Sequence, residues 1–376
     1  MKLSRTLSAL TGACLALALA GCGGAPVSGP GGGGGEVDGP TEAEKFFEEM
    51  NGLSDQERRD KLVSMAQEEG ELDLYTSMTS EVADPVTKAF TDEFDVDVNL
   101  YRAGSETVLQ RILQEAGANY AGNDVVETNA TEMFALGDKE GLLADYAGER
   151  RDMVPDTGRF EDWTATRFNL FAISWNTTLV KPGEEPQKWE DLADPRWDGK
   201  LSMELADYDW YLNLYGYWEK QGKSAEEIDK LFTDMAEGAK VVKGHTVQGE
   251  LMSAGQFAVT ASNYTYLVEN LKRKGAPVDY TPLIGPVIAR PNGLGLMKTA
   301  DHPAAAMLFA DWILDEGQQV MVDLGLTPAI PPNGSDDPLA GVEVLPYDVE
   351  AVLNESDEWS KKYDDLVSRG DQVDSE

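Results

Sequence analysis

The chain has 376 residues, 41% of them hydrophobic, and 68 acidic against 31 basic residues give it a formal net charge of −37. This acidic excess argues against a nucleic-acid partner, because nucleic-acid-binding surfaces need clustered lysine and arginine. The length is sufficient for two domains of ~100–200 residues each, and no segment after the first 20 residues is apolar for long enough to span a membrane.

The N-terminal segment has the three parts of a secretory signal. Lys2 and Arg5 precede an apolar stretch over 7–20, and small residues follow it. The tetrapeptide LAGC, which ends at Cys22, resembles the lipobox of bacterial lipoproteins. That resemblance implies a signal peptide over 1–21, a lipid on the Cys22 thiol and a position outside the cytoplasmic membrane, at the cell surface or in the periplasm. The alternative is an ordinary secretory signal with a chance cysteine.

Residues 22–40 are predicted to form a flexible linker between the lipid and the folded body. The segment contains the runs GPGG and GGGGG and almost no apolar side chains. Such a composition cannot bury enough surface to offset the entropy of ordering the chain. Residues 41–70 are charged and helix-like, and a glycine at position 70 ends this predicted N-terminal helical segment.

The body alternates between strand and helix patterns. Period-two or short apolar runs predict strands over 71–77, 96–101, 124–128, 168–176, 199–205, 256–264 and 293–298. Helical spacing of apolar residues predicts helices over 82–94, 105–115, 208–221, 224–237, 246–254, 266–274 and 302–314. This alternation is typical of an α/β fold with a mostly parallel sheet covered by helices.

The sequence contains no recognisable catalytic motif. It has two histidines and lacks the GxxxxGK[ST], GxSxG, HExxH and CxxC patterns. We therefore predict a protein that is not an enzyme.

Several segments, taken in order, carry a resemblance to a known family. They are LDLYTSMTSEVADPVTKAFTDEF, VNLYRAGSETVLQRILQEAG, NDVVETNATEMFALGDKEGLLADY, FAISWNT, PQKWEDLADPRWDGKLSM and RPNGLGLMKTADHPAAAMLFADWIL. Together they resemble the solute-binding proteins of ABC importers and, more narrowly, the ferric-iron-binding-like group of the family 1 extracellular solute-binding proteins. The resemblance extends over about 72–326.

The resemblance implies a two-lobed periplasmic-binding-protein fold (type II). Each lobe would contain a mixed, mostly parallel sheet with flanking helices, and two crossover segments near 163–176 and 282–290 would join them. We expect lobe 1 over 71–165, lobe 2 over 166–285, a return to lobe 1 over 286–335 and an acidic helical tail over 336–376. The implied partners are an ABC permease and an ATPase, and the implied state is a monomer.

Ligands of open α/β sheets bind at the carboxyl ends of strands and the amino ends of helices, which identifies candidate ligand-binding residues at and beside the ends of the predicted elements. These are Tyr75, Ser77, Arg102, Ser105, Asn129, Asp207, Tyr208, Trp210, His245, Tyr264 and Tyr266. Structural roles are the alternatives: Arg102 could pair with an acidic neighbour, Asp207 could cap a helix, Tyr208 and Trp210 could pack inside a lobe, and His245 could make a structural hydrogen bond.

Two ligand classes stay open at this point. The resemblance implies Fe(III) as the transported ligand, with Tyr264 as a metal ligand, but Thr265 stands where the ferric binders have a second tyrosine. Thr79 and Asn129 likewise stand where that group has a histidine and a glutamate. The second class is a small phosphorylated or carboxylated organic anion, held by Arg102 and by a helix N-terminus at Ser105. A non-transport adhesin or sensor on the same fold is a third hypothesis, because fold does not fix function.

Overall fold

The computed structural model describes residues 39–332, 341–345 and 347–373. The predicted signal peptide over 1–21, the predicted lipid site at Cys22 and nearly all of the predicted linker over 22–40 lie outside these residues. From Pro40 onward, the described residues pack as one unit. Within the described part of the chain, no helix is long and apolar enough to cross a membrane.

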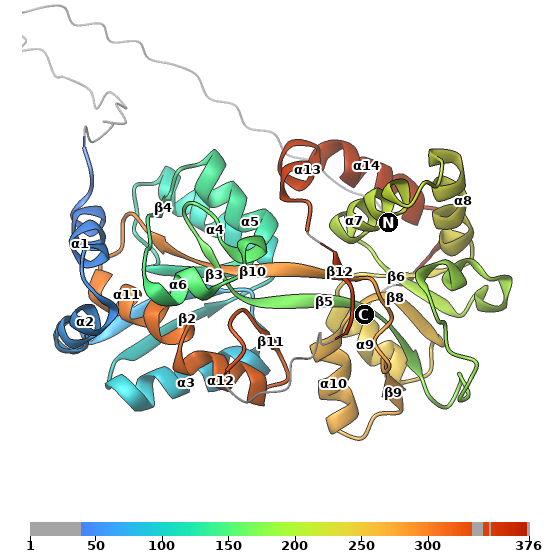
Figure 1. Ribbon diagram of the computed structural model, residues 1–376, viewed down its shortest axis with the longest axis horizontal. Coiled ribbons are helices and arrows are strands. Elements are labelled where there is room, and N and C mark those ends of the chain that lie inside the picture. The colour runs from blue at the N-terminus through green and yellow to red at the C-terminus, as the bar shows by residue number, and fades with distance from the viewer. Residues whose placement is uncertain (1–38, 333–340, 346, 374–376) are drawn as a thin grey trace, which may run out of the picture. The chain divides into compact units, whose positions relative to one another are not determined.

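Strands and helices alternate along most of the chain, as the sequence predicts (Figure 1). The strands are β1 (Glu71–Thr76), β2 (Asp97–Arg102), β3 (Val125–Asn129), β4 (Leu143–Ala144), β5 (Thr164–Asn176), β6 (Leu201–Glu204), β7 (Lys240–Val242), β8 (Val259–Tyr264), β9 (Val278–Asp279), β10 (Val287–Met297), β11 (Thr327–Pro328), β12 (Val344–Leu345) and β13 (Asp371–Val373).

The α-helices are α1 (Glu42–Asn51), α2 (Asp55–Glu69), α3 (Ser80–Phe94), α4 (Ser105–Gly117), α5 (Ala130–Phe134), α6 (Glu149–Met153), α7 (Tyr208–Lys220), α8 (Ala225–Ala236), α9 (His245–Ser253), α10 (Thr265–Arg273), α11 (Pro303–Ile313), α12 (Glu316–Asp323), α13 (Val349–Asn354) and α14 (Ser356–Val367). A π-helical turn (Ala135–Lys139) and 3-10 turns (Asp156–Gly158, Trp189–Ala193, Pro195–Trp197) complete the helical segments.

The main sheet has two parallel halves joined by two long strands. Its order is β13-β7-β6-β8-β5-β10-β3-β1-β2. β1 pairs in parallel with β2 and β3, and β6 pairs in parallel with β7 and β8. Between the halves lie the long strands β5 and β10 (Figure 1). They run antiparallel to each other in a register that pairs Phe171 with Ile288. The predicted α/β class is therefore confirmed.

β5 and β10 correspond to the two predicted crossover segments. β5 spans nearly the whole of the predicted segment at 163–176, whereas β10 begins inside the predicted segment at 282–290 and continues to Met297. Every residue of both strands is buried, which explains why their sequences show no polar alternation. The residue boundaries proposed for the two lobes stay predictions.

The predicted N-terminal helical segment consists of two helices, α1 and α2. Thr41 caps α1 and Ser54 caps α2, each through a capping box with the glutamate three residues later. Arg58 of α2 is 1% exposed and holds Asp311 of α11 through Nη2–Oδ1 and Nε–Oδ2 contacts of 2.6 and 2.8 Å. The segment is thereby fixed to the body.

The predicted acidic tail is an integral part of the fold where the structure describes it. β13 extends the sheet by pairing in parallel with β7, and α14 packs against α7. Tyr363, Leu366 and Val367 of α14 are buried. The segment over 336–376 was predicted to be helical and acidic, and its boundaries stay a prediction. The sequence analysis did not identify the short apolar stripe of α14, whose residues have i, i+3, i+4 spacing.

Candidate functional site

A cavity of about 570 Å³ lies where the carboxyl ends of strands from both halves of the sheet meet the amino ends of several helices. Nine of the eleven predicted ligand-binding residues line it: Ser77, Arg102, Ser105, Asn129, Asp207, Tyr208, His245, Tyr264 and Tyr266. The sheet topology therefore brings together loops that are far apart in sequence. Their contact with a ligand stays a prediction.

The structure places the other two predicted residues, Tyr75 and Trp210, away from the cavity. Tyr75 is 4% exposed, donates a hydrogen bond of 3.1 Å to Glu115 and lies under the guanidinium of Arg111. Trp210 is fully buried on the core side of α7, where its ring packs against Phe232. Strand and helix periodicity turns these two side chains into the core while their neighbours face the cavity.

One wall of the cavity is suited to an anion. Arg102, at the end of β2, is exposed and donates its Nε hydrogen to the carbonyl oxygen of Met78 at 2.7 Å. Among the described residues, no carboxylate lies within 4.0 Å of its guanidinium nitrogens. Next to it, α4 begins at Ser105, and no side chain caps this helix. The free N–H groups of a first helical turn favour negative charge.

Amide side chains orient the hydroxyl group at the start of α4. Asn129 donates from Nδ2 to Ser105 Oγ at 3.1 Å and accepts from Asn292 Nδ2 at 2.7 Å. The three residues lie on α4, β3 and β10 and all line the cavity. These hydrogen bonds link the wall that is suited to an anion to β10, one of the two central strands.

Two further arginines on the central strands line the cavity, and the sequence analysis did not identify them. Arg167 of β5 forms a buried ion pair with Glu127, whose other oxygen accepts a hydrogen bond of 2.7 Å from Thr76. Arg290 of β10 donates from Nη1 to Asp209 Oδ2 at 2.9 Å, and its Nε has no partner among the described residues. Both strands are buried along their whole length, so each arginine requires a partner for its charge.

The opposite wall combines a histidine, tyrosines and carboxylates. His245 Nε2 lies 3.0 Å from Asp207 Oδ2, and the imidazole stacks on Tyr264 with ring centroids 3.9 Å apart. Burial lowers the pKa of His245, but Asp207 and Glu204 raise it by more, so the net shift is upward. The Tyr264 hydroxyl is buried and has no hydrogen-bond partner among the described residues, so it is available to a ligand.

Glu132, at the start of α5, is a cavity residue that the sequence analysis missed. Its Oε2 atom is buried and has no partner within the described part of the chain. Burial raises the pKa of this carboxyl from 4.5 to about 7, against the opposing effect of Arg290. Burial and the negative charge of Asp209 raise the pKa of nearby Tyr208 to about 12, so its phenol resists ionisation.

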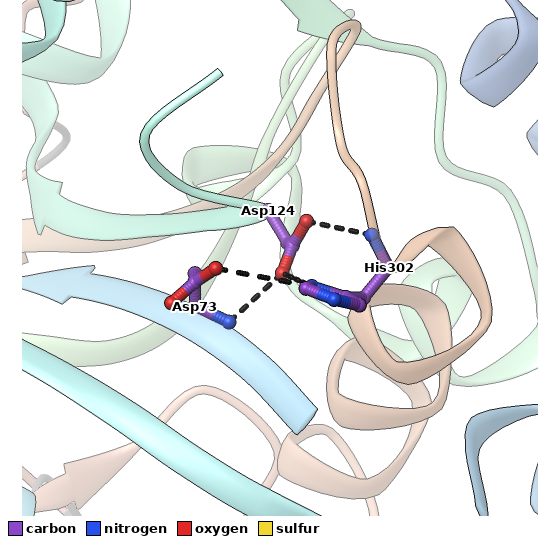
Figure 2. A group of neighbouring side chains, drawn as sticks. All are labelled: Asp73, Asp124 and His302. Carbon is purple, nitrogen blue, oxygen red and sulfur yellow. Dashed lines mark hydrogen bonds and ion pairs between the residues drawn. The ribbon is translucent and has the colours of Figure 1, made fainter. Parts of the chain in front are cut away.

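A separate group of metal-binding residue types lies outside the cavity. Figure 2 shows Asp73, Asp124 and His302, whose ligand atoms lie within 4.8 Å of one another. Asp124 accepts hydrogen bonds of 2.9 Å from the backbone N–H and from Nδ1 of His302, and one of 2.8 Å from the backbone N–H of Asp73. Burial lowers the pKa of His302 but Asp124 raises it by more. The contacts fix the start of α11 and favour a protonated imidazole rather than a metal ligand.

The fold and this cavity define a solute-binding protein, and comparison with known proteins assigns the family. Residues 75–320 match the family described as bacterial extracellular solute-binding protein, and the chain belongs to it. The members are the non-catalytic ligand-binding components of ABC importers, and they act outside the cytoplasmic membrane. The predicted family and the predicted absence of enzymatic activity are thereby confirmed.

Individual relatives are distant. Iron uptake protein A1 of Synechocystis sp. is 24% identical over 270 residues, which cover 68% of this chain and 74% of the relative. Iron-bound HitA from Pseudomonas aeruginosa is 17% identical, with a TM-score of 0.65 over 79% of this chain and 99% of that one. The periplasmic binding protein AfuA from Actinobacillus pleuropneumoniae, with fructose-6-phosphate bound, is 20% identical, with a TM-score of 0.67 over 80% and 99%. At these identities the structures establish the fold alone.

Proposed function

We propose that this protein captures a small organic anion, phosphorylated or carboxylated, and delivers it to the permease and ATPase of an ABC importer. The observation that carries the proposal is Arg102, a cationic side chain without a carboxylate partner among the described residues, beside the uncapped first turn of α4. Arg167 and Arg290 are neutralised by Glu127 and Asp209. The positive potential of the cavity is therefore concentrated at this wall.

The size and the tyrosines of the cavity support an organic ligand. Cavities that hold small molecules typically have volumes of ~300–1,000 Å³, and this one has about 570 Å³. The rings of Tyr264 and Tyr208 would flank the organic part of the ligand.

Ferric iron is the second candidate, and the Tyr264 hydroxyl favours it. This hydroxyl is buried without a partner in the described chain, as a metal-binding phenol would be in the absence of its ion. Some relatives carry iron in their names, whereas AfuA is described with fructose-6-phosphate. Here iron would bind through Tyr264 with a bound anion supplying further donors.

Native mass spectrometry of protein purified from its host, with metal analysis of the same sample, tests the proposal. We expect an organic adduct that Arg102→Ala releases and Tyr264→Phe retains. Removing Arg102 would leave the anion desolvated and unpaired, whereas Tyr264→Phe costs at most one hydrogen bond, ~0.5–1.5 kcal/mol. One iron per chain, with a visible colour that Tyr264→Phe abolishes, would establish iron instead.

We also propose that the protein is anchored by a lipid on Cys22, works as a monomer, and closes its two lobes around the ligand by bending in β5 and β10. The N-terminal sequence features support the anchor. The arrangement of the cavity supports closure, because residues from both halves of the sheet line it. A hinged cleft traps a solute when the two sets of contacts form together.

A further inference from the structure

The C-terminal helix α14 forms part of the cavity wall, although it lies outside the segment that matches the family. The match ends at residue 320, whereas α14 spans Ser356–Val367. Its residues Ser360, Tyr363 and Asp364 line the cavity. They follow one another at i, i+3 and i+4, so they share one face of the helix.

This wall is held in place by buried contacts. The Tyr363 hydroxyl donates a hydrogen bond of 2.6 Å to the carbonyl oxygen of Glu204, at the end of β6. The Tyr363 ring packs on Tyr211 of α7 at a centroid distance of 5.6 Å, and Trp359 packs on the same tyrosine at 5.5 Å. The chain then continues into β13, which pairs with β7. α14 therefore has a defined position relative to the cavity.

The charges around α14 are opposite to those around Arg102. Glu204, Asp207 and Asp364 line the cavity, and all three contribute, after burial, to the raised pKa of Tyr363. His245 pairs with Asp207. Among the described residues no cation lies within 4.0 Å of the carboxylates of Glu204 and Asp364. The cavity thus has a basic wall at Arg102 and an acidic wall at α14.

Carboxylates accept hydrogen bonds and donate none, so the acidic wall selects hydrogen-bond donors. We infer that Ser360 and Asp364 determine specificity by binding hydroxyl or ammonium groups at the end of the solute that lies opposite its anionic group. This inference rests on the proposed function and narrows it. The substrate is an anion with a donor-bearing body, such as a sugar phosphate or an amino-sugar phosphate, rather than a bare inorganic anion.

Calorimetric titration with three probes tests this inference: inorganic phosphate, fructose 6-phosphate and glucosamine 6-phosphate. The variants are Asp364→Asn and Ser360→Ala, and the matched control is Asp365→Asn. Asp365 is the adjacent residue of the same helix, carries the same charge and does not line the cavity. Both aspartates are exposed, so the substitutions should not impair folding, which a thermal unfolding scan of each variant checks.

We expect the wild type to bind at least one ester more tightly than inorganic phosphate. Asp364→Asn should weaken that binding roughly tenfold or more, as the loss of a charged hydrogen-bond partner does, and should leave inorganic phosphate unaffected. If Asp364→Asn weakens the binding of glucosamine 6-phosphate more than that of fructose 6-phosphate, the partner of Asp364 is an ammonium group. If it weakens both equally, the partner is a hydroxyl group.

Three outcomes would overturn the inference. Ester binding that is the same in the wild type, Asp364→Asn and Ser360→Ala would refute it and leave the proposed function intact. Equal weakening by Asp365→Asn would show a general charge effect. A wild type that binds neither esters nor inorganic phosphate would overturn the assignment of a sugar phosphate and leave a carboxylated anion as the remaining ligand class of the proposed function.

Discussion

Replacing Glu132 with glutamine should make the protein more stable at alkaline pH and leave its stability at acidic pH unchanged. Glu132 is partly buried, and burial raises its pKa from 4.5 to about 7. Arg290 opposes this rise, as do hydrogen bonds from Ser105 and from its own backbone, whereas Asp209 adds to it. Glutamine has the same shape and no charge to desolvate.

The sign and the size of the stability change caused by Glu132→Gln follow from proton linkage. A carboxyl group with a raised pKa binds its proton more tightly in the folded chain than in the unfolded chain. The folded state is therefore penalised as the pH rises from 4.5 through about 7, and the penalty is complete above that range. A shift of one pKa unit corresponds to about 1.4 kcal/mol. The rise of the Glu132 pKa from 4.5 to about 7 therefore limits the destabilisation of the folded state to about 3 kcal/mol.

Urea unfolding across this pH range provides the assay. The free energy of unfolding of Glu132→Gln should equal that of the wild type below about pH 4.5 and exceed it by up to about 3 kcal/mol above about pH 7. Glu106→Gln is the matched control, because Glu106 lines the same cavity but is exposed. Parallel stability profiles for the wild type and Glu132→Gln at every pH would refute the argument.

Three further predictions concern the ligand, the N-terminal helices and the anchor. A carboxyl group with a pKa of about 7 is half-protonated at pH 7. An anion beside Glu132 favours the protonated form, so binding at that pH should take up as much as about half a proton. The binding enthalpy should therefore depend on the buffer in the wild type but not in Glu132→Gln. Arg58→Ala should lower the free energy of unfolding by about 3–5 kcal/mol, because it leaves Asp311 buried without its cation. Arg59→Ala removes a more exposed ion pair and should lower the same quantity by under about 1 kcal/mol. Urea unfolding measures both. Cys22→Ser should release the protein from the membrane fraction, since two acyl chains hold a protein that one does not; retention of the variant there would contradict lipid anchoring.

The sequence was sufficient to predict the α/β fold, because the residue pattern of each main strand and helix agrees with the secondary structure that it forms. The helix over 302–314 and the strand over 168–176 were predicted close to the observed α11 and β5. Cavity residues at strand ends, such as Arg102 and Tyr264, could also be predicted. In an α/β sheet, position along the strand determines which loops meet.

Other site residues could not be predicted, because their positions depend on which strands pair. Arg167 and Arg290 lie inside long buried strands and reach the cavity only because β5 and β10 pair at the centre of the sheet. Glu132 follows a strand end but resembles a surface helix residue in sequence. Asp364 belongs to a charged segment that packs on α7 through the ring contact between Tyr363 and Tyr211, two residues far apart in sequence.

The measurement that tests the central claim most directly is a comparison of the wild type and Arg102→Ala in calorimetric titrations with fructose 6-phosphate, citrate and ferric citrate. The account predicts that at least one iron-free anion binds the wild type and that Arg102→Ala weakens this binding roughly tenfold or more, as the loss of a charged hydrogen-bond partner does. Binding of ferric citrate alone, with an affinity that Arg102→Ala leaves unchanged and Tyr264→Phe abolishes, would contradict it.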